Sequence, residues 1–353
     1  MVAGTGREGA ADANALVDAA LAGDRRALAR ILTAVENRTP VAELALRRLY
    51  PLAGGAHLVG ITGPPGAGKS TLVAALIGAA REAGRAVAVV AVDPSSPITG
   101  GALLGDRVRM QSYATDGDVF IRSMAARGHA GGLASTSTAA AAVLDAAGFD
   151  LILLETVGTG QSEVEVAAAA DTTVVLESPE MGDEVQAIKA GLLEVADIVV
   201  VNKGDRPGAQ RTASQLRAML VAVGRAGGGV RNASSSVRHA PEAPERPPRP
   251  RPKEPEVLVT TATTGDGIPE LLAFLDRHRA RGREAGDTPA RLARAEAQVW
   301  AILADRLRAE LHVPANRDAT DATIRSVAAH ELDPFAAADQ LLSGIRLGTP
   351  PRR

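Results

Sequence analysis

The sequence has no cysteine and very few aromatic residues: four Phe, two Tyr and one Trp among 353 residues. The absence of cysteine excludes disulfides, thiolate metal ligands and a cysteine nucleophile. With so few rings, the core must be built mainly from Ala, Val, Leu and Ile. The length predicts roughly two domains and is ample for a well-buried core.

A strong net charge and long apolar runs are also lacking. The formal net charge is −2, so the chain carries no strong field for polyanions, and we expect no nucleic-acid partner. No apolar run approaches the ~20 residues that span a bilayer. The charged start, with Arg7, Glu8 and Asp12, does not resemble a signal peptide. The sequence therefore predicts a cytoplasmic protein without membrane contact.

Lysine is the rare cation in this chain. Of the 39 Lys and Arg residues, only Lys69, Lys189, Lys203 and Lys253 are lysine. A GC-rich genome explains the general preference for arginine. An ammonium is nevertheless a compact point charge, whereas a guanidinium is a broad planar fork. The positions that kept lysine are therefore candidates for a site that needs the smaller cation.

Hydrophobic patterning predicts an α/β fold. Residues 12–50 show the apolar spacing of helices, with breaks at Asn37 and Pro40. Continuous apolar runs then alternate with helical patterns, which is typical of a parallel sheet covered on both faces. The expected strands are 57–62, 86–92, 119–122, 151–155, 172–177, 198–201 and 257–260.

Three segments are predicted: an N-terminal helical extension (1–53), an α/β domain (54–282) and a C-terminal helical segment (283–353). Residues 226–256 hold seven prolines between 241 and 255, a composition that predicts a disordered insertion. A second C-terminal helix is expected from Asp321, with a break at Pro334. The C-terminal apolar stripe must be covered by the same chain or by a second copy; it comprises Leu292, Ala295, Val299, Ile302, Leu303 and Leu307.

The strongest motif is the glycine-rich loop GPPGAGKS at residues 63–70. It matches GxxxxGK[ST], follows an expected strand and precedes a helical pattern over 71–82. In such a loop, backbone N–H groups close around phosphate oxygens, the lysine reaches the β- and γ-phosphates, and the serine hydroxyl binds Mg²⁺. The expected nucleotide contacts are Gly63, Pro64, Pro65, Gly66, Ala67, Gly68, Lys69, Ser70 and Thr71.

A second motif, Asn202-Lys203-Gly204-Asp205, directly follows the strand 198–201. This is the NKxD pattern of guanine-nucleotide-binding proteins. The Asp205 carboxylate can accept hydrogen bonds from guanine N1–H and the 2-amino group, which adenine lacks, and each such bond contributes about 1.5–3 kcal/mol. The Lys203 stem is expected along the base plane. Further contacts to the base are expected from Thr261, Ala262 and Thr263.

Carboxylates near strand ends predict a Mg²⁺ site. Glu155, at the tip of strand 151–155, could hold the ion directly or through water, and the Gly158 N–H could contact the γ-phosphate. Asp93 and Asp106 are the other expected members of the shell, together with Ser70. Some of these carboxylates must act through water, because one Mg²⁺ cannot take them all directly.

Two further polar residues are candidates for catalysis. Gln161 could orient the attacking water or make a structural hydrogen bond. Lys189 lies on a helical pattern and could belong to a solvated helix face, but this chain normally places Arg on such faces. We therefore hypothesise that Lys189 reaches the active site or a partner; GTP hydrolysis by a Lys189→Arg variant tests this. The catalytic candidates are Lys69, Asp106, Glu155, Gln161 and Lys189.

Together these runs resemble the MeaB/ArgK-type GTPases, the cobalamin-associated GTPases of methylmalonyl-CoA mutase and related enzymes. The resemblance covers most of residues 12–345. Its most specific carriers are Asp-Pro-Ser-Ser-Pro at 93–97 and Glu-Thr-Val-Gly-x-Gly-Gln-Ser-Glu at 155–163. The other carriers are 60–71, 99–110, 120–124, 127–129, 182–197, 202–205 and 332–342.

The resemblance implies a P-loop NTPase G domain with a mostly parallel sheet, and a homodimer formed through the C-terminal helices. It implies GTP and GDP as ligands with Mg²⁺, and a role as a chaperone of a cobalamin-dependent acyl-CoA mutase. In such proteins, GTP hydrolysis gates adenosylcobalamin delivery and the ejection of damaged cofactor. Residues 177–189 would be a switch loop that relays the nucleotide state to the mutase.

The chain departs from the family pattern in places, and other functions are conceivable. The switch loop reads Pro179-Glu180-Met181-Gly182-Asp183 where Pro-Gly-x-Gly-Asp is usual, which restricts φ > 0 at residue 180. Thr261-Ala262-Thr263 replaces the usual Ser-Ala-Leu, and the insertion is longer than expected. The alternative function is an ATP-using kinase or ATPase accessory of basic-amino-acid transport. A metal-delivery GTPase for nickel enzymes is disfavoured by the lack of Cys and of His clusters.

Overall fold

The computed structural model describes residues 5–94, 110, 112–113, 115–126, 132–156, 169–179, 196–227, 255–284 and 288–344. The chain divides into two compact units, Met1–Arg294 and Ala295–Arg353. The first unit holds the sheet, and the second holds the C-terminal helices. Most of the expected insertion 226–256 lies outside the described residues.

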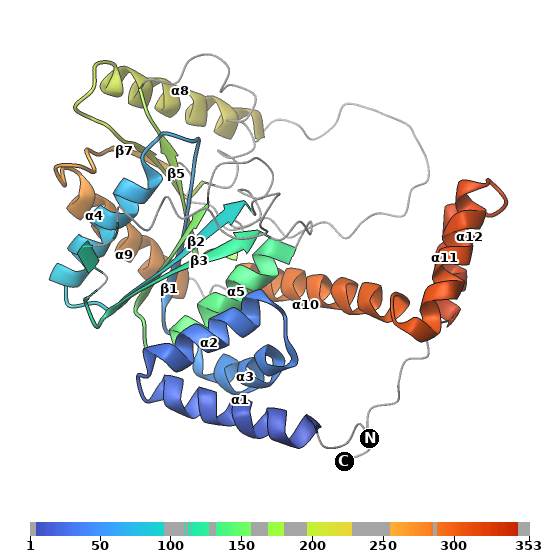
Figure 1. Ribbon diagram of the computed structural model, residues 1–353. Helices are drawn as coiled ribbons and strands as arrows, with labels where there is room; N and C mark the ends of the chain where they lie inside the picture. The colour runs from blue at the N-terminus through green and yellow to red at the C-terminus, as the bar shows by residue number, and fades with distance from the viewer. Residues whose placement is uncertain are drawn as a thin grey trace. The chain divides into compact units, whose positions relative to one another are not determined.

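The first unit is built on a seven-stranded parallel sheet with the order β3-β2-β4-β1-β5-β6-β7 (Figure 1). All seven expected strands are present, so the predicted α/β class is confirmed. β2 and β3 run further than expected, because their pairing continues as far as Pro94 and Ala126. The strands are β1 (His57–Thr62), β2 (Val87–Pro94), β3 (Val119–Ala126), β4 (Leu151–Thr156), β5 (Thr172–Glu177), β6 (Ile198–Val201) and β7 (Glu256–Val259).

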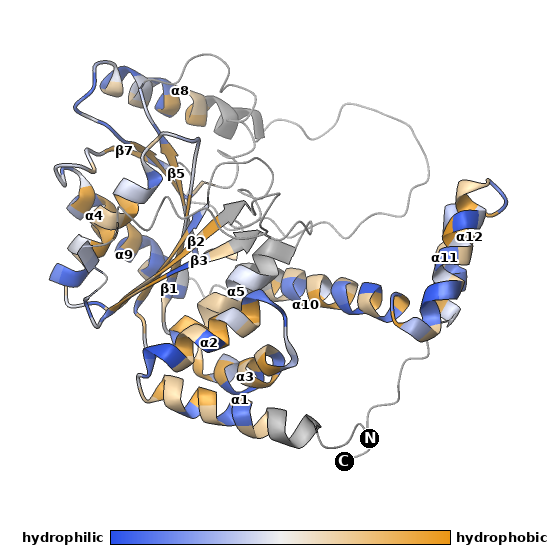
Figure 2. Cartoon of the chain, viewed as in Figure 1, coloured by the Kyte–Doolittle hydropathy of each residue, from blue (hydrophilic) through white to orange (hydrophobic). Residues whose placement is uncertain are grey.

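Helices cover both faces of the sheet. On one face, Ala88, Val90 and Val92 of β2 share a core with α1, α2, α3 and α5. On the other face, Val87 and Val89 pack with α4 and α9. Figure 2 shows the resulting apolar strands between the helices, and burial on both faces explains the continuous apolar runs. The helices of this unit are α1 (Thr5–Leu21), α2 (Arg25–Glu36), α3 (Pro40–Leu49), α4 (Lys69–Glu82), α5 (Gly132–Ala146), α8 (Ala209–Gly227) and α9 (Ile268–Glu284).

The N-terminal segment forms three helices rather than the two that its breaks predicted. The additional break lies between α1 and α2, where Gly23 takes a φ of +90°. The Asp24 carboxylate then accepts hydrogen bonds from the N–H groups of Arg26 (2.8 Å) and Ala27 (3.2 Å), which caps α2. The predicted breaks are present, since Asn37 closes α2 and Pro40 opens α3.

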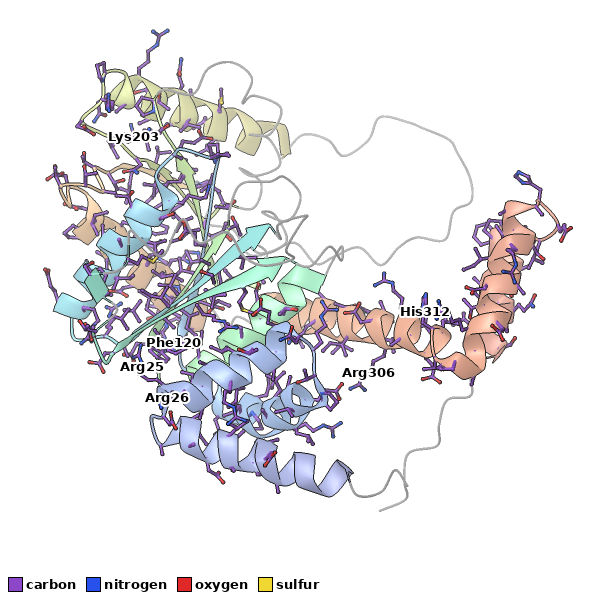
Figure 3. All side chains as sticks on the ribbon, viewed as in Figure 1. Arg25, Arg26, Phe120, Lys203, Arg306 and His312 are labelled. Atoms are coloured by element: carbon purple, nitrogen blue, oxygen red, sulfur yellow. The ribbon has the colours of Figure 1, made fainter. Side chains whose placement is uncertain are left out.

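Arginine contacts attach α2 to the edge strand β3. The Arg25 guanidinium donates to the carbonyls of Gly117 (2.6 Å) and Val119 (2.5 Å). It also lies over the ring of Phe120, 5.3 Å from the centroid (Figure 3). Arg122 on β3 pairs with Glu36 at 2.8 Å. The N-terminal helices therefore belong to the same packed unit as the sheet.

The C-terminal helices are α10 (Thr288–Leu311), α11 (Pro314–Ala328) and α12 (Pro334–Gly344). α11 begins at Pro314 rather than at the expected Asp321, because proline suits the first turn of a helix. Pro334 likewise opens α12, so the expected break is a helix start. None of the helices in the described part of the chain is long and apolar enough to cross a bilayer.

We predict that Ile31→Ala lowers the free energy of unfolding of the whole first unit by about 2–5 kcal/mol, because the Ile31 side chain of α2 is fully buried in the core that α1, α2, α3 and α5 share with the sheet. Leu44→Ala, at an exposed site on α3, should cost at most about 0.5 kcal/mol. Chemical denaturation followed by circular dichroism measures both changes. A separate early transition for the N-terminal helices would contradict the single packed unit.

Candidate nucleotide site

The glycine-rich loop joins β1 to α4 at the carboxyl edge of the sheet. Gly63 has a φ of +142°, and a Cβ there would lie 2.3 Å from the Leu176 carbonyl oxygen on β5. Gly68 has a φ of +95°, and its Cβ would lie 2.4 Å from the Asn202 side-chain nitrogen. The loop packs closely on β5 and on the loop after β6, and for this reason only glycine fits at these two positions.

Lys69 lies folded over this loop. Its Nζ donates to the carbonyl oxygens of Gly63 (2.6 Å) and Pro64 (3.2 Å), and the side chain is buried. Lys69 is also the first residue of α4, so its ammonium and the positive end of the helix dipole lie at the same place. This arrangement favours an anion bound at the loop, as the sequence predicted.

Ser70 and Glu155 meet across the first turn of α4. The Ser70 hydroxyl donates to Glu155 Oε1 at 2.6 Å, and both side chains are buried. Glu155 is next to Ile61 of β1 and Ala91 of β2, so it lies in the middle of the sheet near its carboxyl edge. A hydroxyl oxygen and a carboxylate are hard oxygen donors of the kind that Mg²⁺ prefers, so the pair fits the predicted metal site.

The other predicted metal and catalytic residues are described only in part. The backbone of Asp93 pairs with Ala125 of β3 and follows Val92, which is next to Thr156 of β4. Asp93 therefore reaches the same edge of the sheet as Glu155. Asp106, Gly158, Gln161 and Lys189 lie outside the described residues.

The buried Asn202 side chain connects two loops. Its Nδ2 donates to the Ala67 carbonyl at 3.0 Å, and its Oδ1 accepts from the Ala262 N–H at 3.1 Å and the Thr260 hydroxyl at 3.3 Å. The sequence predicted Asn202 as a nucleotide contact, whereas the structure places its amide between the phosphate loop and the segment after β7. Thr260 was not predicted, and only its position directly before Thr261 pointed to it.

The two loops that follow β6 and β7 lie side by side. Gly204 donates its N–H to the Thr260 carbonyl at 2.9 Å, and Lys203, marked in Figure 3, takes a left-handed φ of +58°. The turn after β7 is closed by the Thr261 N–H, which donates to the Asp266 carbonyl at 2.9 Å. Asp205, which directly follows Gly204, is exposed.

Those predicted site residues that the structure describes lie at one edge of the sheet. The phosphate loop follows β1, Glu155 is the second-last residue of β4, and the two expected base loops follow β6 and β7. Thr71 continues α4 behind Ser70, while Thr261 and Ala262 are buried and Thr263 is exposed. A crevice outside the carboxyl ends of parallel strands is where open α/β sheets bind ligands.

The chain is similar to known proteins along most of its length. The family model of methylmalonyl Co-A mutase-associated GTPase MeaB matches residues 28–316. A Pyrococcus horikoshii protein, provisionally named a GTPase, is 44% identical over 331 residues, which cover 94% of this chain and 97% of that protein. The mouse protein named methylmalonic aciduria type A homolog, mitochondrial, is 32% identical over 92% of this chain and 77% of its own length.

Among solved structures, the chain is similar to a LAO/AO transport system kinase. That structure matches with a TM-score of 0.61 and 26% identity, covering 94% of this chain and 97% of the other. The fold therefore recurs in a solved structure that matches nearly the whole chain. The chain belongs to the MeaB family of methylmalonyl-CoA mutase-associated GTPases, and it is a GTP hydrolase of the P-loop NTPase class.

Proposed function

We propose that this GTPase is a chaperone of a cobalamin-dependent acyl-CoA mutase, such as methylmalonyl-CoA mutase. Hydrolysis of GTP to GDP and phosphate would gate the loading of adenosylcobalamin and protect or reactivate the mutase. The main observation in support is that the buried Asn202 side chain joins the phosphate loop to the loop that carries Asp205. The mutase as partner is supported by the name of the matching family.

Guanine selectivity would come from Asp205. Its carboxylate accepts two hydrogen bonds from guanine, at N1–H and the 2-amino group, but adenine offers no donor at either position. Asn202 would fix the distance between this carboxylate and the phosphate loop, because its amide holds both loops. Lys203 would pack its stem along the base.

Phosphoryl transfer in this site would rest on positioning and charge. The loop N–H groups and the Lys69 ammonium would bind the β- and γ-phosphates, and Lys69 would exchange the Gly63 and Pro64 carbonyls for phosphate oxygens. Bound Mg²⁺ would supply further neutralisation of the phosphate charge. We propose that the residues holding it are Ser70, Asp93, Asp106 and Glu155. Three roles stay predictions: water orientation by Gln161, γ-phosphate contact by Gly158, and contact of Lys189 with the active site or a partner.

Substitution of Asp205 tests the base specificity. Asp205→Asn should weaken GTP binding by about tenfold or more, since two charge-assisted hydrogen bonds are lost. The same variant should gain affinity for xanthosine triphosphate, because the new amide can donate to the C2 carbonyl of xanthine and accept from N1–H. Competition binding with GTP, ATP and xanthosine triphosphate measures this. Equal affinity of the unaltered protein for GTP and ATP would favour the ATP-using transport accessory.

The mutase role is tested with the purified partner enzyme. The GTP-loaded and GDP-loaded protein should differ in how fast adenosylcobalamin is transferred to or retained by the mutase, as followed by absorbance. Lys69→Ala should abolish the difference, because the γ-phosphate loses its cation. Transfer that is independent of the nucleotide would contradict the chaperone proposal but leave the GTPase assignment intact.

A homodimer would cover the apolar surface of the C-terminal helices. Within the described part of α11 and α12, only Thr320, Thr323 and Ala337 are buried. Large apolar side chains are exposed, among them Leu292, Val299, Trp300, Leu303, Ile324 and Phe335. Helices that bury so little surface cannot offset the entropy of ordering them. We therefore propose that a second copy packs here and that 283–353 is the dimerisation segment. The division into a helical extension (1–53), a GTPase domain (54–282) and this segment stays a prediction, as does a cytoplasmic location.

The dimer is tested by placing charge on the α10 stripe. Combined Val299→Arg and Leu303→Arg changes should convert a dimer into a monomer, as measured by analytical ultracentrifugation, because burying two unpaired guanidinium groups is costly. Arg308→Glu, at an exposed charged position of α10, is the matched control and should leave the dimer intact. A monomer in the unaltered protein would contradict the proposal.

A further inference from the structure

Two arginines of α9 meet at the amino edge of the sheet, opposite the nucleotide site. Arg279 and Arg283 both donate from Nη2 to the carbonyl oxygen of Gly55, which precedes β1, and the Arg283 distance is 3.0 Å. Because both nitrogens contact one oxygen, they lie at most about 6 Å apart. The negative end of the α9 dipole favours a cation such as Arg283 in the last turn, but it does not explain why two arginines meet on one neutral acceptor.

The shared carbonyl belongs to a loop that α5 holds in place. The Asp145 carboxylate of α5 accepts hydrogen bonds from the N–H groups of Gly54 (2.6 Å), Gly55 (3.2 Å) and Ala56 (2.9 Å). These three bonds use the N–H donors of the loop and leave the Gly55 carbonyl for α9. The two guanidinium groups are therefore positioned by a backbone segment that is itself fixed.

Among the described residues, no carboxylate forms an ion pair with either guanidinium. Arg279 and Arg283 each donate only to the Gly55 carbonyl in this part of the chain. The neighbouring Arg85 differs, because it is bound to Asp276 of α9 through two hydrogen bonds of 2.7 and 2.6 Å. A guanidinium carries five N–H donors. Each group of the pair therefore keeps four donors that no described protein group accepts.

The surroundings disfavour the positive charge of Arg279. Burial lowers the pKa of its guanidinium, and the charges of Arg283 and Arg85 lower it further. The carboxylates of Asp171 and Asp145 oppose this shift without cancelling it. An anion bound to both guanidinium groups would correct this imbalance.

The ring of His57, two residues after Gly55, adds no positive charge at neutral pH. Burial lowers the pKa of His57 from 6.5 to about 4. Its Nε2 lies 2.8 Å from the Thr172 hydroxyl, which in turn lies 2.8 Å from His278 Nδ1. His57 is therefore a neutral part of the packed interior, and an anion at this edge would be bound by arginine.

We propose that Arg279 and Arg283 form a binding site for one phosphate group. The oxygens of a phosphate can accept hydrogen bonds from both guanidinium groups at once, and the planar fork of each group matches phosphate geometry. A phosphate near its dianionic form would neutralise both cations, whereas one carboxylate would neutralise a single cation. Free phosphate and the phosphate monoester of a small molecule share this chemistry.

The site is tested by calorimetric titration of the full-length protein with inorganic phosphate and with glycerol 3-phosphate, at constant ionic strength. The phosphate loop is first filled with Mg²⁺ and a GTP analogue that cannot be hydrolysed. One phosphate per chain should then bind saturably, and acetate should bind at least about tenfold more weakly. Tighter binding of inorganic phosphate would identify the free ion as the ligand, and tighter binding of glycerol 3-phosphate would identify an ester. Equal binding of acetate, or no saturable binding, would contradict the proposal.

Two matched pairs of arginines on α9 separate this site from a general effect of charge. Arg279→Gln with Arg283→Gln should weaken phosphate binding by about tenfold or more, because charge-assisted hydrogen bonds are lost. Arg277→Gln with Arg281→Gln removes the same charge from the same helix at the same spacing and should leave phosphate binding unchanged. If the first pair folds poorly, Arg283→Gln alone, at an exposed position, should weaken binding severalfold. Equal phosphate affinity in the two double variants would overturn the site.

Lys69→Ala separates the α9 site from the nucleotide site. Without nucleotide, this variant should still bind one phosphate per chain, because Lys69 lies in the phosphate loop at the opposite edge of the sheet. Loss of nucleotide binding together with retained phosphate binding would support the α9 site independently of the GTPase chemistry. Loss of all phosphate binding in Lys69→Ala would assign the phosphate to the phosphate loop and refute the α9 site.

Discussion

The arrangement of this protein depends on one buried amide, that of Asn202. Its three hydrogen bonds connect the phosphate loop after β1 with the segment after β7, although β5 and β6 separate these strands in the sheet. The amide can do so because Gly68 leaves room for it, where any Cβ would collide. Removal of this side chain would leave the Ala67 carbonyl and the Ala262 N–H without a hydrogen-bond partner. Each unpaired group would lower the free energy of unfolding by about 1–3 kcal/mol. The predicted base and phosphate halves of the site are therefore one rigid unit.

Much of the fold could be predicted from the sequence, because a parallel sheet buried on both faces leaves a strong signal. The run at 87–92 is apolar at every position, and the structure buries it on both sides. Strand bounds were predicted better than helix bounds. The start of α11 was missed because Pro314 reads equally well as a breaker, and the end of α1 depended on the left-handed turn at Gly23.

The candidate site was predictable where one motif supplies both position and chemistry, as at Lys69 and Ser70. It was less predictable where residues meet across the sheet. The contact of Ser70 with Glu155 requires the register of β1 and β4, and the protein groups that Asn202 contacts lie in two distant segments. The His57, Thr172 and His278 contacts are harder still, because 115 and 106 residues separate the bonded pairs and no spacing rule links them.

The two edge strands are closed by arginine. Arg25 occupies carbonyls at the start of β3, and Arg217 of α8 donates to the Val257 carbonyl of β7 at 2.9 Å. Each of these arginine contacts forms only after its helix has docked on the sheet. The strands of a parallel sheet also pair slowly, because they are distant in the chain. Before α2 and α8 dock, both edges would present backbone groups that can template pairing with another molecule. The docking rates of α2 and α8, rather than the final stability, would set how much newly made protein escapes aggregation.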